Sequence, residues 1–354
     1  MSAIWQKIRA DGLRTLAVMG MSKNTGKTVA LNHVLAKAHD EHLCLGVTSI
    51  GRDGEDRDQV FNFPKPPVLV WPGQVVATAR MTLQRSKVAY KLLGTTGLES
   101  PIGEIVLVKA LEHGAMEVAG ASRSSEQAVV ISRLQQCGAE LVLLDGALGR
   151  SHHASPAIAD GIILATGAAI GGAVQDVVRK TRDRLAILGI QEADEALKAL
   201  VSPVLAHGQS GVALWSRDGT CLFHEPIATL NAGPVLLRFL DQPVGTVAVS
   251  GAVGKTLWQA LMKLGAAQPG LRFVVMDGTK LFVDAVELAQ FERQGGVVRG
   301  LRGIRLTGLT LNPFSPMGGH FDAEELLAEA RDAFPHLHVT DVVLEESQPL
   351  GVAP

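Results

Sequence analysis

The chain has 354 residues, of which 47% are hydrophobic and 19% charged, and its formal net charge is -2. This length suits two domains better than one. The near-neutral charge excludes the global basic field with which many proteins bind nucleic acid. Three scattered cysteines form no C-x-x-C pair, as is typical of reduced thiols in a cytoplasmic protein.

Targeting and membrane signals are not expected. Lys7 and Arg9 stand where a secretory signal needs its apolar core. The uncharged run 161–175 is shorter than the stretch of about 20 apolar residues that spans a membrane. The sequence therefore predicts a cytoplasmic protein that uses neither membrane nor nucleic acid.

The first predicted elements are a strand over 15–18 and a helix over 27–39, joined by the loop Gly-Met-Ser-Lys-Asn-Thr-Gly-Lys-Thr at 20–28. In a phosphate-binding loop, backbone N–H groups and the first helical turn converge on phosphate oxygens, backed by about half a positive charge from the helix dipole. Lys27 is predicted to reach the outer phosphates and Thr28 to ligate Mg²⁺. The alternative is a glycine-containing turn with a surface lysine. The predicted nucleotide-binding residues are Gly20, Lys23, Asn24, Thr25, Gly26, Lys27 and Thr28.

The loop departs from the common spacing. Five residues separate Gly20 and Gly26, and Met21 occupies the place of the usual first glycine. This layout resembles the loop of dethiobiotin synthetases and related ATP-dependent amide-forming enzymes. The resemblance implies a nucleotide domain that binds ATP or GTP with Mg²⁺. It also implies that Lys23 is a candidate to contact phosphate across a subunit boundary in a homo-oligomer.

An acidic segment follows the next predicted strand, over 43–50. Asp53 and Glu55 belong to a run of acids at 53–58 that alternates with Arg52 and Arg57. Such a run is usually solvated. In an open α/β sheet, however, this loop lies at the carboxyl edge beside the phosphates. We therefore predict Asp53 to position the attacking water or to stand in the metal shell.

Further strands are predicted over 102–108 and 115–118, and a helix is predicted from Ser124 to about Cys137, because Ser124 and Gln127 have capping-box spacing. The apolar runs 141–146 and 161–167 predict strands buried on two faces, and a helix over 171–188 follows. The fold class is therefore α/β, with a P-loop nucleotide-binding domain over 1–190 built on a mostly parallel sheet.

Asp145 stands at the carboxyl end of the strand 141–146. From this position a carboxylate reaches the Mg²⁺ of the loop, directly or through water. The alternative is a turn formed by Asp145 and Gly146, since Asp-Gly pairs are common in turns. Lys27, Asp53 and Asp145 are the predicted catalytic residues, and Thr28 and Asp145 the predicted Mg²⁺ ligands.

A second, smaller α/β domain is predicted over 200–354, to bind a partner or ligand. Strands are expected over 246–250, 272–276 and 306–311, and helices over 256–264, 283–293 and 322–332. The segment 250–256 ends in Gly-Lys-Thr, but its glycines are too close for a phosphate loop, so a tight turn is predicted. The strand ends 277–280 and 312–316 are expected to face one cleft with it.

A set of short segments is spread in order over nearly the whole chain, at 20–28, 49–55, 117–120, 145–148, 154–156, 166–168, 277–280 and 312–318. Their order and spacing resemble the family of the lysine 5,6-aminomutase reactivase B subunit. This resemblance implies an ATP-dependent reactivating chaperone subunit for an adenosylcobalamin-dependent aminomutase of the lysine 5,6- or ornithine type, which promotes exchange of damaged cobalamin. The implied partners are the mutase and a second, MutS-like ATPase subunit. Lys27, Thr28 and Asp145 would bind and hydrolyse MgATP.

Two other classes of function remain open from the sequence. One is an ATP-dependent ligase or amidase of the dethiobiotin synthetase group, which needs a small-molecule acceptor pocket beside the γ-phosphate. The other is a nucleotide-sensing interaction protein. A chaperone is distinguished from a ligase because a protein, rather than a small acid, stimulates its hydrolysis of ATP.

Overall fold

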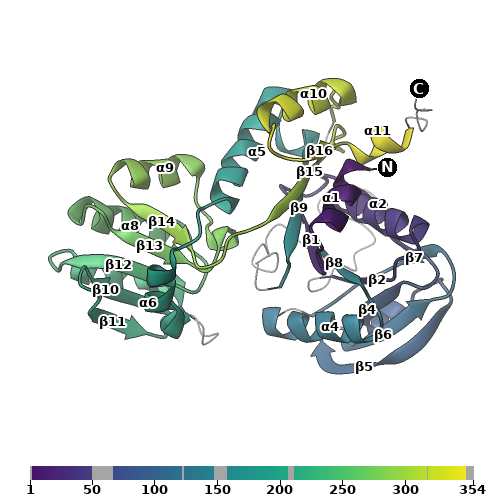
Figure 1. Ribbon diagram of the computed structural model, residues 1–354, viewed down its shortest axis with the longest axis horizontal. Helices are drawn as coiled ribbons and strands as arrows, with labels where there is room; N and C mark the ends of the chain where they lie inside the picture. Colours follow the sequence, from purple (N-terminus) through teal and green to yellow (C-terminus); the bar gives the residue numbers. More distant parts are fainter. Residues whose placement is uncertain are drawn as a thin grey trace. The chain divides into compact units, whose positions relative to one another are not determined.

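The computed structural model describes residues 2–49, 67–121, 123–146, 158–205, 211–316 and 318–347. The chain forms two compact units (Figure 1). Unit 1 consists of Met1–Thr181 and Arg305–Pro354, and unit 2 of Arg182–Ile304. This division differs from the predicted domains 1–190 and 200–354, because the strand after residue 305 pairs in the sheet of unit 1.

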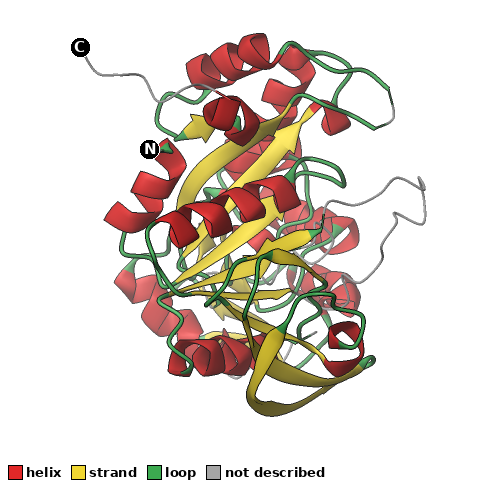
Figure 2. Cartoon of the chain, turned by 90° about the vertical axis from the view of Figure 1, so that its right-hand side faces the viewer, coloured by secondary structure: helices red, strands yellow, loops and turns green. Residues whose placement is uncertain are grey.

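Unit 1 is built on a nine-stranded sheet in the order β16-β15-β9-β1-β8-β2-β4-β6-β5, which twists from strand to strand (Figure 2). All its neighbouring strands run parallel except β4 with β6 and β6 with β5. The mixed α/β class with a mostly parallel sheet is therefore confirmed. The strands are β1 (Thr15–Gly20), β2 (Leu45–Ser49), β4 (Val75–Ala79), β5 (Tyr90–Ser100), β6 (Gly103–Ala110), β8 (Leu141–Asp145), β9 (Gly161–Gly167), β15 (Leu306–Asn312) and β16 (Val339–Thr340).

Unit 1 has helices before, between and after its strands. They are α1 (Ala3–Ala10), α2 (Lys27–Asp40), α3 (Arg80–Leu83), α4 (Ser124–Gln136), α5 (Val174–Leu188), α10 (Ala323–Ala333), α11 (Val342–Ser347) and the 3₁₀ turn η2 (Ala168–Ile170). The last turns of α5 lie in unit 2. No helix in the described ranges is long and apolar enough to cross a bilayer.

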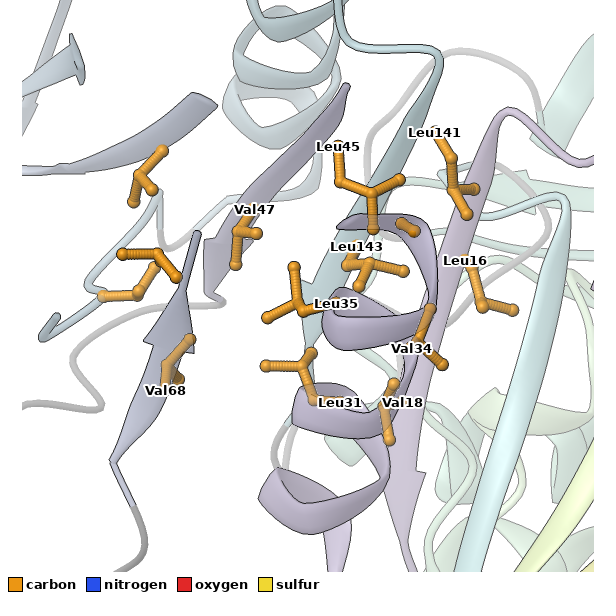
Figure 3. Packing of buried hydrophobic residues seen from close by; sticks show 14 of the residues in the cluster. Leu16, Val18, Leu31, Val34, Leu35, Leu45, Val47, Val68, Leu141 and Leu143 are labelled. Carbon is orange, nitrogen blue, oxygen red and sulfur yellow. The ribbon is translucent and has the colours of Figure 1, made fainter. Parts of the chain in front are cut away.

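The helix α2 packs its apolar side against the central strands. Figure 3 shows Leu31, Val34 and Leu35 of α2 gathered with Val18, Val47 and Leu143 of the sheet. These side chains belong to one cluster and are essentially inaccessible to solvent. Burying a leucine side chain contributes about 1.5–3 kcal/mol. This packing fixes the helix that follows the loop 20–26.

Antiparallel strands occupy the side of the sheet beyond β2. The sequence predicts β6 and the short β7 (Gly114–Met116), but not β4, β5 or β3 (Val68–Val70). β3 and β7 form a separate two-stranded sheet. The edge strand β5 is exposed along its first four residues, so it lacks the apolar run by which buried strands are recognised.

The start of α4 differs in detail from the prediction. Ser124 is the first helical residue, Arg123 is the N-cap, and no side chain caps it. The capping box of Ser124 and Gln127 is therefore wrong. The Gln127 side chain is instead fully buried and donates from Nε2 to the Ser49 carbonyl oxygen at the end of β2, over 3.3 Å.

Unit 2 has a five-stranded sheet in the order β11-β10-β12-β13-β14, in which β12, β13 and β14 run parallel. Trp258, Phe273 and Phe291 lie at the centre of its main core. Its elements are α6 (Glu195–Leu205), β10 (Val212–Ser216), β11 (Cys221–Glu225), η3 (Thr229–Asn231), α7 (Ala232–Leu236), η4 (Leu237–Phe239), β12 (Val244–Val249), α8 (Lys255–Ala267), β13 (Arg272–Val275), η5 (Gly278–Lys280), α9 (Ala285–Arg293) and β14 (Val297–Gly300).

Candidate functional site

The loop at 21–26 follows β1 and leads into α2, as predicted. Two of its residues have left-handed backbone: Asn24 with φ 62° and Gly26, the N-cap of α2, with φ 88°. Glycine adopts this conformation freely, and asparagine is among the few other residues that tolerate it. The sequence therefore supplies suitable residues at both positions where the loop reverses direction.

Contacts within the loop explain why position 20 is glycine. A Cβ atom at Gly20 would lie 2.6 Å from Thr25 Oγ1 and 2.9 Å from Lys27 Cγ. The buried Thr25 hydroxyl donates to the Ser22 carbonyl oxygen over 3.0 Å. The Met21 N–H group donates to the Ala165 carbonyl oxygen of β9 over 2.8 Å. The loop is therefore compact and tied to the neighbouring strand.

Lys27 and Asp145 meet at the carboxyl edge of the sheet. β1 and β8 are parallel neighbours with Val18 opposite Asp145, so both strands end beside the loop. Lys27 Nζ lies 3.5 Å from Asp145 Oδ1 and donates to the Gly146 carbonyl oxygen over 2.5 Å. The Asp145 side chain is only 2% exposed. A cation and a carboxylate are thus held together where the parallel strands end.

Thr28 lies in the first turn of the same helix and is 6% exposed. None of the residues of that turn is acidic. A hydroxyl, an ammonium group and a carboxylate are the donors and acceptors that a magnesium–phosphate ligand requires. Lys27 and Asp145 therefore meet at the start of α2, and Thr28 follows Lys27 in the first turn of this helix.

Polar contacts beside Asp145 hold the end of β2 in place. The Ser49 hydroxyl donates to the Asp145 carbonyl oxygen over 3.4 Å, and Gln127 donates to the Ser49 carbonyl oxygen. A Cβ atom at Gly120 would lie 1.9 Å from that same Ser49 oxygen. Ser49 and Gln127 were not predicted as site residues, because a serine and a glutamine in apolar surroundings carry no motif.

Asn312 is a further residue of the site that the sequence did not identify. It ends β15 and donates from Nδ2 to the Asn24 carbonyl oxygen of the loop over 2.8 Å. The prediction that 312–316 ends a strand of the second domain's sheet is wrong, because β15 pairs with β9 in unit 1. The sequence indicates that Asn312 and Pro313 end a strand, but it does not indicate which sheet this strand joins.

The remaining predicted residues divide into two groups. Lys23 is exposed on the loop, and its hydroxyl neighbour Ser22 donates to the Lys23 carbonyl oxygen over 2.8 Å. Asp53 and the other acids of 53–58 lie outside the described residues. Among the described residues, no group of three or more His, Cys, Asp or Glu side chains is placed to hold a metal ion.

The corresponding edge of unit 2 is organised differently. The segment 250–254 turns tightly from β12 into α8, with Gly254 as the N-cap. At the end of β13, Asp277 is buried and accepts from the N–H of Thr279 over 2.9 Å and from its hydroxyl. Burial lowers the pKa of Lys280 beside it. The Asp277 carboxylate thus caps the short helix η5.

The defining contacts of the site are Lys27 with Asp145 and Gly146, and Asn312 with Asn24. They connect the loop after β1 and the start of α2 with the ends of β8 and β15. Comparison with protein-family models, curated proteins and solved structures gives no match to this chain.

Proposed function

We propose that unit 1 is a P-loop NTPase domain that binds and hydrolyses MgATP, and that the chain serves as a reactivating chaperone subunit for an adenosylcobalamin-dependent aminomutase. The observation that carries the first part is the contact of Lys27 with the buried Asp145 beside a loop with left-handed residues, with Thr28 next to Lys27 in the first turn of α2. A structural turn with a surface lysine would leave Lys27 in solvent, whereas its side chain is 15% exposed and faces a buried carboxylate.

The residues present fit a magnesium–phosphate ligand. The side of Gly20 that faces Thr25 and Lys27 has no room for a Cβ atom, so glycine at this position lets these two side chains pack against the backbone. The helix α2 begins at Lys27 without a side-chain cap, and uncapped N–H groups at a helix start favour anions. Thr28 and Asp145 would hold the metal, whose charge would stabilise the developing negative charge of the phosphoryl group.

Lys27 has to change partners when phosphate binds. Its ammonium group is held by the Gly146 carbonyl oxygen and lies near Asp145. A phosphate oxygen accepts a charge-assisted hydrogen bond that is stronger than one to a neutral carbonyl. Lys27 would therefore leave Gly146 for the outer phosphates, and Asp145 would become available to orient the metal or its water.

The partner part of the proposal rests on the resemblance to the reactivase B subunit. Nucleotide can expel damaged cobalamin only if it stabilises the mutase conformation that binds cobalamin weakly. A weakening of about 100-fold corresponds to about 2.7 kcal/mol of coupling, which is within the usual range. Unit 2 is proposed to contact the mutase or the MutS-like subunit, because it has its own core and sheet apart from the nucleotide site.

The test is to add a cobalamin-inactivated lysine 5,6- or ornithine aminomutase, with the second reactivase subunit, to the purified chain. ATP hydrolysis should increase, and cobalamin should leave the mutase only when ATP is present. The Lys27→Ala chain should still dock but should not release cobalamin. Consumption of ATP with a small carboxylic or amino acid, without any protein partner, would favour the ligase alternative instead.

A further inference from the structure

Asn312 bridges two backbone segments that are far apart in the sequence. Its Nδ2 group donates to the carbonyl oxygen of Asn24 over 2.8 Å, and its Oδ1 accepts from the N–H of Phe314 over 3.1 Å. Both ends of the amide are therefore used. The bond to Phe314 fixes which end of the amide faces the loop, so that the end with the hydrogen atoms is turned to Asn24.

The surroundings of Asn312 leave little freedom for this side chain. A Cβ atom at Gly26 would lie 3.1 Å from Asn312 Cβ, and one at Gly167 would lie 1.9 Å from the Asn312 carbonyl oxygen. Asn312 is paired with Gly167 in the parallel register of β15 and β9. Two glycines thus allow β15 to approach the loop closely enough for the amide to reach it.

The bond to Asn24 determines the direction of a whole peptide unit. The carbonyl of Asn24 and the N–H of Thr25 belong to one planar, trans peptide group and point in opposite directions. Asn24 has the left-handed backbone at which the loop reverses. Holding its carbonyl oxygen therefore also orients the Thr25 N–H group, one of the donors assigned to phosphate.

We propose that Asn312 is a positioning residue of the nucleotide site, which acts through the loop and touches no part of the nucleotide. The inference rests on the proposed function, since it assumes that the loop binds phosphate. It assigns to the last strand of the large sheet a role in phosphate affinity. It also requires that the effect of Asn312 be independent of the base.

The decisive variant is Asn312→Asp, which keeps the size and still accepts from Phe314 but has no hydrogen atom to donate to Asn24. Two oxygen acceptors would then face each other at a distance of a hydrogen bond. Affinity should be measured by calorimetry for MgATP, for MgGTP and for magnesium tripolyphosphate, which has no base. We expect all three affinities of the variant to fall by the same factor, about tenfold.

Asn32 supplies a matched control. It bridges backbone in the same way, donating from Nδ2 to the Pro67 carbonyl oxygen over 2.9 Å and accepting from the N–H of Leu69 over 2.9 Å. It lies on α2 but its partners are not in the loop. Asn32→Asp should lower the melting temperature to a similar degree as Asn312→Asp and leave tripolyphosphate affinity unchanged.

The affinities distinguish a failure of the Asn312 inference from a failure of the proposed function. If Asn312→Asp weakens ATP but not tripolyphosphate, Asn312 contacts the nucleoside and the inference is overturned. Unchanged affinity for all three ligands would overturn it as well. If the wild-type chain binds none of them, the proposed function fails first. If Asn312→Asp does not fold, Asn312→Ala can replace it. Alanine also removes the Nδ2 donor, but it places no oxygen opposite the Asn24 carbonyl oxygen. This variant should show a smaller loss of affinity that is the same for all three ligands.

Discussion

Lys27 is held in place by two partners at the end of β8. Its ammonium group has the Gly146 carbonyl oxygen as an acceptor at 2.5 Å and the Asp145 carboxylate at 3.5 Å. Both partners lie on the segment that ends β8, so the lysine is kept at the carboxyl edge of the sheet. If the proposed function is right, the ordering of the long side chain, which costs entropy, is therefore largely complete before phosphate binds.

The first prediction concerns this lysine. Lys27→Ala should weaken MgATP binding by about tenfold or more, because a charged hydrogen bond contributes about 1.5–3 kcal/mol. Lys255→Ala, at the first residue of α8 in the other Gly-Lys-Thr segment, should leave binding unchanged. Titration of both variants with labelled ATP checks this. A comparable loss at Lys255 would mean that unit 2 has a nucleotide site of its own.

The second prediction separates binding from turnover. Asp145→Asn keeps the size of a nearly inaccessible side chain but removes the charge that would organise Mg²⁺. Hydrolysis of ATP should therefore fall far more than ATP affinity. Steady-state kinetics and calorimetry on the same preparations measure both quantities. Equal turnover in the wild type and the variant would leave Asp145 as a turn-forming residue.

At the scale of single elements, α2 depends on the packing of its apolar side for stability. Leu35 is fully buried in the cluster that joins the helix to β2 and β8. Leu35→Ala should lower the free energy of unfolding by about 2–5 kcal/mol, the cost of a cavity in a packed core. Urea denaturation of the two proteins tests it. An effect below about 1 kcal/mol would show that the helix is held mainly by the loop.

The short helix α11 should give the chain a dependence of stability on pH. Asp341 is buried and accepts from the N–H groups of Val343 and Leu344 over 2.9 and 3.2 Å. Burial raises the pKa of this carboxyl despite those bonds. The folded state therefore binds the proton more tightly than the unfolded state, and stability is lost as the pH rises from the ordinary value through the raised pKa.

Asp341→Asn keeps an oxygen acceptor for both N–H groups but has no charge to bury. The variant should be more stable than the wild type at neutral pH, and the difference should shrink at acid pH, where Asp341 is protonated. Melting temperatures measured from pH 4 to pH 8 follow this directly. A variant that loses stability at every pH would show that the charge-assisted cap outweighs the cost of burial.

An element could be predicted from the sequence where neighbouring residues alone form its pattern. β8 and β9 are runs of buried residues, which a local apolar pattern predicts. The position of Asp145 at the edge of the sheet could be predicted because this residue ends the run of β8. The edge strand β5 alternates between exposed and half-buried residues after an exposed start, so the sequence resembles a loop. Asn312 was missed for a different reason: its partner Asn24 lies 288 positions away, and no local pattern reports a contact of that range.

At the scale of the whole molecule, unit 1 is completed only by the last part of the chain. A chain ending at Ile304 lacks β15 and β16, so β9 becomes an unpaired edge strand and the loop loses Asn312. We expect such a chain to lose ATP binding and the thermal transition of unit 1, while unit 2 keeps a cooperative transition. Scanning calorimetry with and without MgATP tests this. Retention of ATP-dependent stabilisation in the shortened chain would contradict it.

The interruption of unit 1 by unit 2 also has a consequence for the order of events during synthesis. Residues 182–304 emerge from the ribosome ahead of β15, and they contain all the strands of their own sheet. Domains fold as units while the chain grows at about 5–20 residues per second. Unit 2 can therefore fold before β15 pairs with β9. A nascent chain is exposed to edge-to-edge pairing in this interval, and the loop 21–26 gains its contact with Asn312 only when translation is nearly finished.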